Sequence, residues 1–117
     1  MDTELYTISK SATVLEAADK IQRNHLRCVM VLEGEKVVGV CSQGDILRLL
    51  LNGGNVYTII DKVLKPSFVF LKEKDWNKAF LLMKQHGITL VPILDNEFRL
   101  LDVITMPMIF EKVTFNP

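Results

Sequence analysis

The sequence of 117 residues has little of what several classes of protein require. Its 14 Lys and Arg residues balance 14 Asp and Glu residues, so it lacks the positive charge with which proteins bind a nucleic-acid backbone or an anionic membrane. No apolar run approaches the ~18 residues that span a bilayer. The start has no basic segment followed by an apolar one, so we expect no signal peptide. We therefore expect neither nucleic acid nor membrane as a partner.

Cysteine and histidine are equally scarce, with two of each. Cys28 and Cys41 lie in apolar segments typical of strands and do not form a C-x-x-C pair, which favours buried thiols in a reducing cytoplasm over a disulfide. His25 and His86 have no partner at the spacing of a zinc site, and their places near helix ends favour a helix-dipole or C-cap role over catalysis. No nucleophile and base occur together. We expect no metal site, no cofactor and no catalytic residue, so the protein is predicted not to be an enzyme.

What the chain does have is an internal repeat with a shift of 62 residues, which lengthens to 63 near the end. Each half contains an apolar quartet with the i, i+3, i+4, i+7 spacing of a buried helix face. Each half also contains three short apolar runs typical of strands. The quartets are Val14, Ala17, Ala18 and Ile21, then Trp76, Ala79, Phe80 and Met83, and the runs are 6–8, 28–32 and 37–42, then 68–70, 90–94 and 100–105.

Each half therefore predicts the order strand, helix, strand, turn, strand, helix. Thr13 and Asp75 mark the starts of the first helices, and the last helix of each half is expected over 45–51 and 108–113. Neither half alone buries a large core, so we expect them to pack together around a pseudo-two-fold axis. The predicted fold is α/β (α+β), with two small, mostly antiparallel sheets and two helices on each. Repeat 1 covers residues 1–58 and repeat 2 covers residues 59–117.

This arrangement, together with the sequence Gly39-Val40-Cys41-Ser42-Gln43-Gly44-Asp45, resembles a pair of cystathionine-β-synthase (CBS) domains, also called a Bateman module. The most specific element is the Gly-x-x-Ser/Thr-x-x-Asp signature of that family. Residues 87–95 resemble the family's second common sequence. The resemblance implies a regulatory module that binds AMP, ADP, ATP or S-adenosylmethionine in a cleft between the two repeats.

The resemblance also implies which residues bind the ligand. Asp45 would accept hydrogen bonds from the two ribose hydroxyls. Ser42 would offer its hydroxyl to a phosphate or sugar oxygen, and Gly39 would let the ligand approach the backbone closely. Lys65 would contact a phosphate. The apolar side chains would enclose the base. The complete predicted set is Val40, Ser42, Asp45, Val63, Lys65, Phe68, Ile88 and Thr89.

Local structural roles remain open for several of these residues. Ser42 and Asp45 also have the spacing of a helix capping box, with Asp45 at an exposed position. Lys65 fits a solvated turn, and Phe68 fits the core. Arg27 aligns with Thr89 and is either a surface residue or a phosphate contact, in a second cleft formed with the signature of the second copy or at a dimer interface.

The second copy departs from the signature. Asp102 stands where the glycine is expected and Met108 where the aspartate is expected, so only Thr105 is kept. A thioether is a weak acceptor for a ribose hydroxyl. We therefore expect one intact nucleotide site in each chain.

Three functions follow from these observations in different classes. The first is a ligand-sensing regulator, and the alternative is a structural dimerisation module that has lost nucleotide binding. A small transferase is the third, without a residue to carry it. Apolar residues of the second helices favour a homodimer in either of the first two cases. The motif Gly44-Asp45-Ile46-x-Arg48 also resembles the CBS pair found before the catalytic domain of sugar-phosphate nucleotidyltransferases, which implies a catalytic domain after residue 117.

Overall fold

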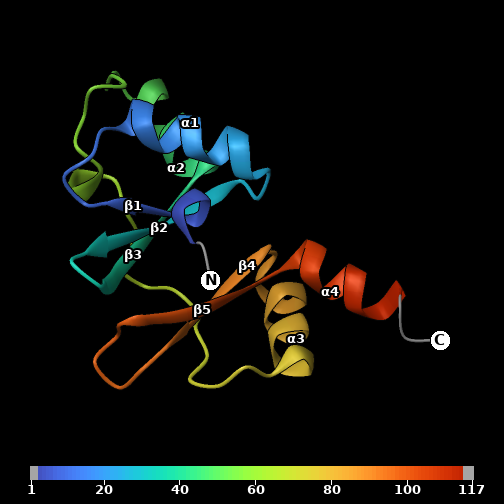
Figure 1. Cartoon of the computed structure of the whole chain (residues 1–117). Helices are drawn as coiled ribbons and strands as arrows, with labels where there is room; N and C mark the ends of the chain where they lie inside the picture. Colours follow the sequence, from blue (N-terminus) through green and yellow to red (C-terminus); the bar gives the residue numbers. More distant parts are fainter. Residues whose placement is uncertain (1–2, 115–117) are drawn as a thin grey trace. The chain divides into compact units, whose positions relative to one another are not determined.

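Two units of helices and strands follow each other along the chain, as the repeat predicts (Figure 1). The computed structural model describes residues 3–114, and the units divide between Phe68 and Val69. The first contains β1 (Thr7–Ser9), α1 (Val14–Asn24), β2 (Cys28–Glu33), β3 (Lys36–Ser42) and α2 (Gln43–Leu51), with 3-10 turns at Glu4–Tyr6 and Ile60–Lys62. The second contains α3 (Trp76–His86), β4 (Leu90–Leu94), β5 (Leu100–Thr105) and α4 (Met106–Thr114).

The sheets confirm the α+β class and the relation between the copies. β1 pairs parallel with β2, β2 pairs antiparallel with β3, and β4 pairs antiparallel with β5. The register shifts between Val31 and Leu32 in the first hairpin and between Ile93 and Leu94 in the second. These are equivalent positions of the repeat, so even the irregularity of the hairpin recurs. How the two copies pack stays a prediction.

The first helix of each unit begins and ends at the residues that the sequence indicates. The Thr13 side chain accepts a hydrogen bond from the Glu16 N–H at the start of α1, and Asp75 accepts one from the Lys78 N–H at the start of α3. Such caps satisfy N–H groups that have no partner inside the helix. At the other ends, His25 (φ 60°) and Gly87 (φ 64°) both take the left-handed conformation of a C-cap,. The capping role is confirmed for His25, whereas His86 is the last residue of α3 and Gly87 is its cap.

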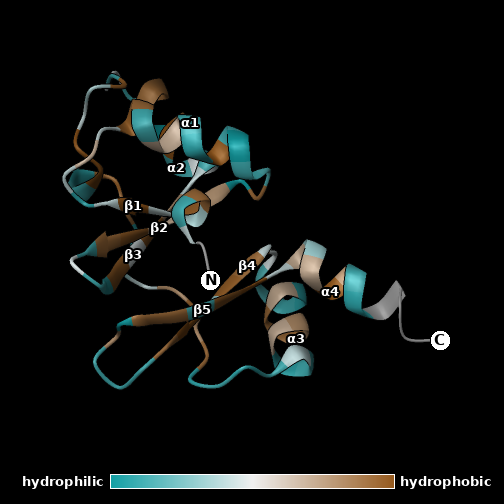
Figure 2. Ribbon diagram, viewed as in Figure 1, coloured by the Kyte–Doolittle hydropathy of each residue, from teal (hydrophilic) through white to brown (hydrophobic). Residues whose placement is uncertain are grey.

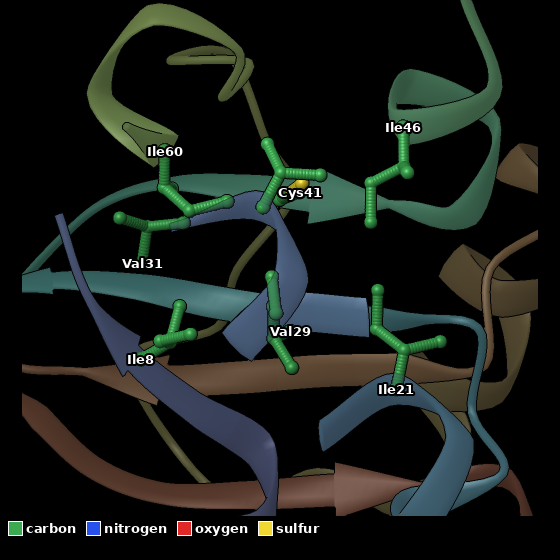
Figure 3. Close-up of a cluster of buried hydrophobic side chains, with 9 residues drawn as sticks. Ile8, Ile21, Val29, Val31, Cys41, Ile46 and Ile60 are labelled. Atoms are coloured by element: carbon green, nitrogen blue, oxygen red, sulfur yellow. The ribbon is translucent and has the colours of Figure 1, made fainter. Parts of the chain in front are cut away.

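The core of the first unit lies between its sheet and its two helices (Figure 3). Val14, Ala17 and Ile21 point inward from α1, three to four residues apart, because that spacing keeps them on one face,. Ile46 of α2 and residues of all three strands also belong to the cluster. The exposed side of α1 is largely hydrophilic (Figure 2).

The second unit has a separate core formed by α3, β4, β5 and α4. Ala79 and Met83 are buried there, and Trp76 packs against them as predicted. Phe80 belongs to the same predicted quartet, but 42% of its surface is exposed. The burial of Phe80 was therefore predicted wrongly, because Leu82 rather than Phe80 packs on this core.

Residues 59–68 start the second copy in sequence yet pack on the first unit. Ile60 is fully buried in the first core, and its N–H donates to the Ala12 carbonyl oxygen at 2.8 Å. The strand predicted over 68–70 does not form. A single parallel bridge between Leu71 and Ile93 replaces it, and the chain as far as Phe68 belongs to the first unit.

Candidate functional site

The predicted signature lies where β3 ends and α2 begins. Ser42 is the N-cap of α2, and its Oγ accepts a hydrogen bond from the Asp45 N–H at 3.1 Å. In return, Oδ2 of Asp45 accepts from the Ser42 N–H at 2.8 Å and from the Ser42 hydroxyl at 2.9 Å. This reciprocal pattern is a complete capping box, so the local role considered from the sequence is confirmed. α2 begins at Gln43, two residues earlier than expected.

Asp45 is buried, which corrects its predicted exposed position. Only 5% of its surface is accessible, because cationic side chains cover the other oxygen. Oδ1 contacts the Arg48 guanidinium and lies 3.4 Å from the Lys65 ammonium. Burial raises the pKa of Asp45, but the Ser42 hydrogen bonds, Lys65 and Arg48 together outweigh burial and hold it below 3.8,. Asp45 is therefore ionised at neutral pH.

Lys65 is held at the site by its backbone. Its N–H donates to the Val40 carbonyl oxygen at 2.9 Å, and its own carbonyl oxygen accepts from the Val40 N–H at 3.0 Å. This antiparallel bridge attaches residues 64–65 to the edge of β3. Val40 and Lys65 are too far apart in the sequence for local patterns to predict this pairing. The Lys65 side chain is 61% exposed, while its ammonium lies beside Asp45.

Gly39 has a different role from the one expected. A Cβ at this position would lie 2.5 Å from Leu64 Cδ1 and 2.6 Å from the Lys65 carbonyl oxygen. Real Cβ atoms do not approach other atoms so closely, and φ of Gly39 is not positive. Gly39 therefore makes room for the chain itself, at residues 64–65, and the predicted role of admitting a ligand is not needed to explain it.

The structure brings together Val40, Ser42, Asp45 and Lys65 of the predicted set. Val63 is half-buried and packs against the first core, and Phe68 is half-buried at the end of the first unit. The remaining two residues, Ile88 and Thr89, belong to the second unit, where Ile88 packs on the second core and the Thr89 carbonyl oxygen accepts from the Met106 N–H. Their contribution to this site stays a prediction.

Arg48 is a residue that the predicted set omitted. It follows Asp45 by three positions on α2, a spacing that places two side chains on the same face of a helix. That spacing was the available signal in the sequence. The Arg48 side chain remains 59% exposed while it contacts the buried carboxylate. The carboxylate of Asp45 and the two accessible cations of Arg48 and Lys65 thus lie together at the start of α2. We call this group of residues, with Ser42, the head of α2.

The equivalent place in the second unit has no such group. Thr105 is buried, and its Oγ1 accepts a long 3.4 Å bond from the Met108 N–H, which copies the Ser42 cap. Met108 supplies no carboxylate. The Asp102 carboxylate already has two partners. Its Oδ2 lies 3.1 Å from the Lys74 ammonium, and its Oδ1 accepts a hydrogen bond from the Val103 N–H at 2.7 Å. Burial raises the pKa of Asp102, but these two contacts outweigh it and leave the pKa lowered.

A separate pocket of about 480 Å³ lies in the first unit between α1 and α2. Ile21, His25, Arg27, Gln43 and Leu47 are among its lining residues. Arg27 is exposed and has a positive φ of 66°. Arg27 thus lines this pocket, while its phosphate contact in the other cleft stays a prediction.

Two further features bear on function within residues 3–114. No helix in this range has the length and apolar character needed to cross a membrane. No group of three His, Cys, Asp or Glu residues in the same range has the arrangement of a metal site.

Sequence relatives support the resemblance for the first copy. Residues 1–52 match the family model of the CBS domain. An uncharacterized protein of Methanopyrus kandleri is 26% identical over 112 residues, which cover 92% of this chain and 57% of that protein. Arabinose 5-phosphate isomerase GutQ of Salmonella typhi is 29% identical over 99 residues, which cover 82% of this chain and 30% of the enzyme. The chain thus spans less than two thirds of both relatives.

Solved structures share the fold. A CBS domain pair/ACT domain protein of Thermotoga maritima has a TM-score of 0.77 at 21% identity, covering 97% of this chain and 91% of that one. A CBS domain protein of Pyrobaculum aerophilum complexed with AMP has a TM-score of 0.71 at 19% identity, covering 96% and 97%. A CBS domain pair in complex with 5′-methylthioadenosine and S-adenosyl-L-methionine has a TM-score of 0.75 at 17% identity, covering 95% and 89%. The fold and the family match together support a CBS domain pair.

Proposed function

We propose that this protein is a regulatory module that binds an adenine nucleotide or a related adenosyl ligand at the head of α2. The observation that carries the proposal is the ionised, buried carboxylate of Asp45, held by Ser42 and flanked by Lys65. A carboxylate accepts hydrogen bonds only, so it suits the two vicinal hydroxyls of a ribose. The structural relatives that bind AMP or S-adenosyl-L-methionine support the same ligand class.

Each predicted site residue in the first unit has a role in this proposal. Asp45 binds the ribose, the Ser42 cap fixes the carboxylate, and Lys65 binds a phosphate. Val40, Val63 and Phe68 provide apolar surface for the base. Ile88 and Thr89 complete the predicted site from the second unit. Binding, and not catalysis, is the activity assigned to these groups.

The proposal includes the setting in which the module works. Homodimerisation through the second helix of each repeat and control of a linked or partner enzyme follow from the resemblance to regulatory CBS pairs. The sequence Gly44-Asp45-Ile46-x-Arg48 favours a nucleotidyltransferase as that enzyme, and the isomerase relative shows a similar segment within a sugar-phosphate enzyme. The free thiols of Cys28 and Cys41 fit a cytoplasmic location,.

The test compares nucleotides that differ only in the ribose. Calorimetric titration with AMP, 2′-deoxy-AMP and 3′-deoxy-AMP measures the contribution of each hydroxyl without changing the protein. We expect each deoxy compound to bind at least about tenfold more weakly, since a hydrogen bond to a charged group contributes ~1.5–3 kcal/mol. Equal affinities for all three would contradict the ribose assignment.

A matched pair of variants extends this test. Asp45→Asn removes the charge and one acceptor, so affinity for AMP should fall at least about tenfold. Asp75→Asn makes the same chemical change at the N-cap of α3, in the second unit, and should leave AMP affinity unchanged. Circular dichroism at the titration temperature verifies that both variants are folded.

A structural dimerisation module is the second candidate function. It is favoured by one observation: Ser42, Arg48 and Lys65 all contact the Asp45 carboxylate, so its oxygens have partners within the chain. This candidate predicts a stable dimer whose melting temperature does not change with AMP, ADP, ATP or S-adenosylmethionine. A thermal-shift series with these four compounds separates the two functions.

A further inference from the structure

The donors around Asp45 leave no acceptor position open for a ribose. A carboxylate offers about four acceptor positions. The Ser42 N–H and hydroxyl take two at Oδ2, and Arg48 and Lys65 lie at Oδ1. A ribose diol must therefore displace donors before it binds.

The two cations are the donors that can leave. The Ser42 contacts are short and belong to the cap that starts α2. Lys65 is 3.4 Å from Oδ1, and the side chains of Lys65 and Arg48 are 61% and 59% exposed on long, flexible stems. Water already reaches both cations, so moving them leaves neither one buried, and the Oδ1 that they uncover is the oxygen that the ribose hydroxyls then contact.

The charge of the ligand then decides how favourable this displacement is. One carboxylate and two cations give the head of α2 a net charge of +1. A nucleotide brings a phosphate that replaces the carboxylate as the partner of the displaced cations. Adenosine brings no charge. S-adenosylmethionine has one carboxylate but also a sulfonium and an ammonium, so it is positive overall and the net positive charge of the site disfavours it.

We propose that Arg48 and Lys65 act together as a phosphate selector, releasing Asp45 to the ribose and binding the ligand phosphate in its place. The site then prefers phosphorylated adenine nucleotides over adenosine and S-adenosylmethionine. This inference rests on the proposed function, since it requires Asp45 to bind a ribose. It adds Arg48 as a specificity-determining residue and narrows the ligand class.

The test measures affinities for AMP, adenosine and S-adenosylmethionine by calorimetry at low ionic strength. For the unaltered protein we expect AMP to bind at least about tenfold more tightly than the other two, because charge-assisted pairs are involved. In the double variant Arg48→Ala/Lys65→Ala this preference should fall to about equal affinities. Adenosine should bind the double variant at least as tightly as it binds the unaltered protein, since two competing donors are gone.

Adenosine binding by the double variant distinguishes loss of the phosphate preference from misfolding. A misfolded site would lose affinity for both AMP and adenosine, whereas the proposal predicts that adenosine binding is kept or increased. Lys62→Ala removes an exposed lysine three residues before Lys65 and serves as the matched control. Equal binding of AMP and adenosine by the unaltered protein would overturn the selector while leaving the nucleotide function intact. Binding of none of the three ligands would overturn the proposed function, and the selector with it. An unchanged AMP preference in the double variant would also overturn the selector.

Discussion

Gly39 lies so close to Lys65 that a Cβ on Gly39 would be 2.6 Å from the Lys65 carbonyl oxygen, next to the antiparallel bridge between Val40 and Lys65. The close approach lets the backbone of Lys65 pair with Val40 on both sides. That pairing in turn directs the Lys65 ammonium toward Asp45. One glycine of the signature thus serves the site indirectly, through the position of a residue that is distant in sequence.

Gly39→Ala is expected to destabilise the protein and to loosen the site. The added methyl meets the Lys65 backbone and the half-buried Leu64 side chain, and overpacking of this kind costs about 1–3 kcal/mol. Urea denaturation should show the loss as a lower midpoint. Gly44→Ala is the control, since its Cβ would have only ordinary contacts at 3.6 Å and would lie in α2. Alanine there should be neutral or stabilising by about 0.5–1 kcal/mol. Equal midpoints for the two variants would contradict the packing role of Gly39.

The ion pairs of Asp45 predict a specific dependence of stability on pH. Its pKa in the folded protein is lower than the ordinary value of 3.8, so the folded state favours the ionised form. This contribution to stability is complete above the ordinary pKa and is lost as the pH falls through the lower folded pKa.

Urea denaturation of the unaltered protein and of Asp45→Asn between pH 7 and pH 3 measures this contribution. At pH 7 the variant should be less stable by about 1.5–3 kcal/mol, the magnitude of a lost hydrogen bond to a charged group. The difference should shrink below pH 4, because a protonated Asp45 resembles asparagine. A difference that stays constant over the whole range would show that the charge of Asp45 does not stabilise the fold.

The two thiols should be unreactive in the folded protein. Burial raises the pKa of Cys28 to about 11, against the opposing effect of Arg27. Burial, and next to it the negative charge of Asp45, raises the pKa of Cys41 to about 12. Because the thiolate is the nucleophile, alkylation by iodoacetamide at pH 8 should be at least about a hundredfold slower in buffer than in urea. Mass spectrometry of the two cysteine peptides measures each rate, and rapid modification of Cys41 in buffer would contradict its burial.

Local patterns were sufficient for the elements that depend on neighbouring residues in the sequence. The quartet around Val14 and the caps at Thr13 and Asp75 predicted α1 and α3, because helix periodicity and capping act within a few residues. The capping role of Ser42 followed from the same kind of signal. The repeat then extended these predictions from one half of the chain to the other.

Features that depend on distant contacts were predicted less well. Asp45 has the spacing of an exposed capping residue, and it is buried partly because Lys65 reaches it from another segment. Residues 59–68 belong to the second copy in sequence but to the first unit in space, since Ile60 fills the first core. The strand over 68–70 was inferred from the repeat alone, and only Leu71 makes the bridge.

α2 leaves an apolar surface that predicts self-association. Ile46 is buried and Leu49 packs on the first core, so the helix already uses one face for folding. Leu47, Leu50 and Leu51 remain 52%, 41% and 85% exposed. Three leucines on one short helix are more exposed apolar surface than a solvated helix needs. On this basis we expect a homodimer, to which Phe110 of α4, 61% exposed, contributes from the second unit.

Analytical ultracentrifugation at tens of micromolar should therefore detect a species of about twice the 13.3 kDa chain mass. The double variant Leu47→Glu/Leu51→Glu places two negative charges on this surface and should sediment as a monomer with unchanged circular dichroism. Leu101→Glu changes a leucine of β5 that is 59% exposed, and it should leave the dimer intact. A monomer at the same concentration for the unaltered protein would contradict the interface, because nothing else in α2 requires these leucines to face solvent.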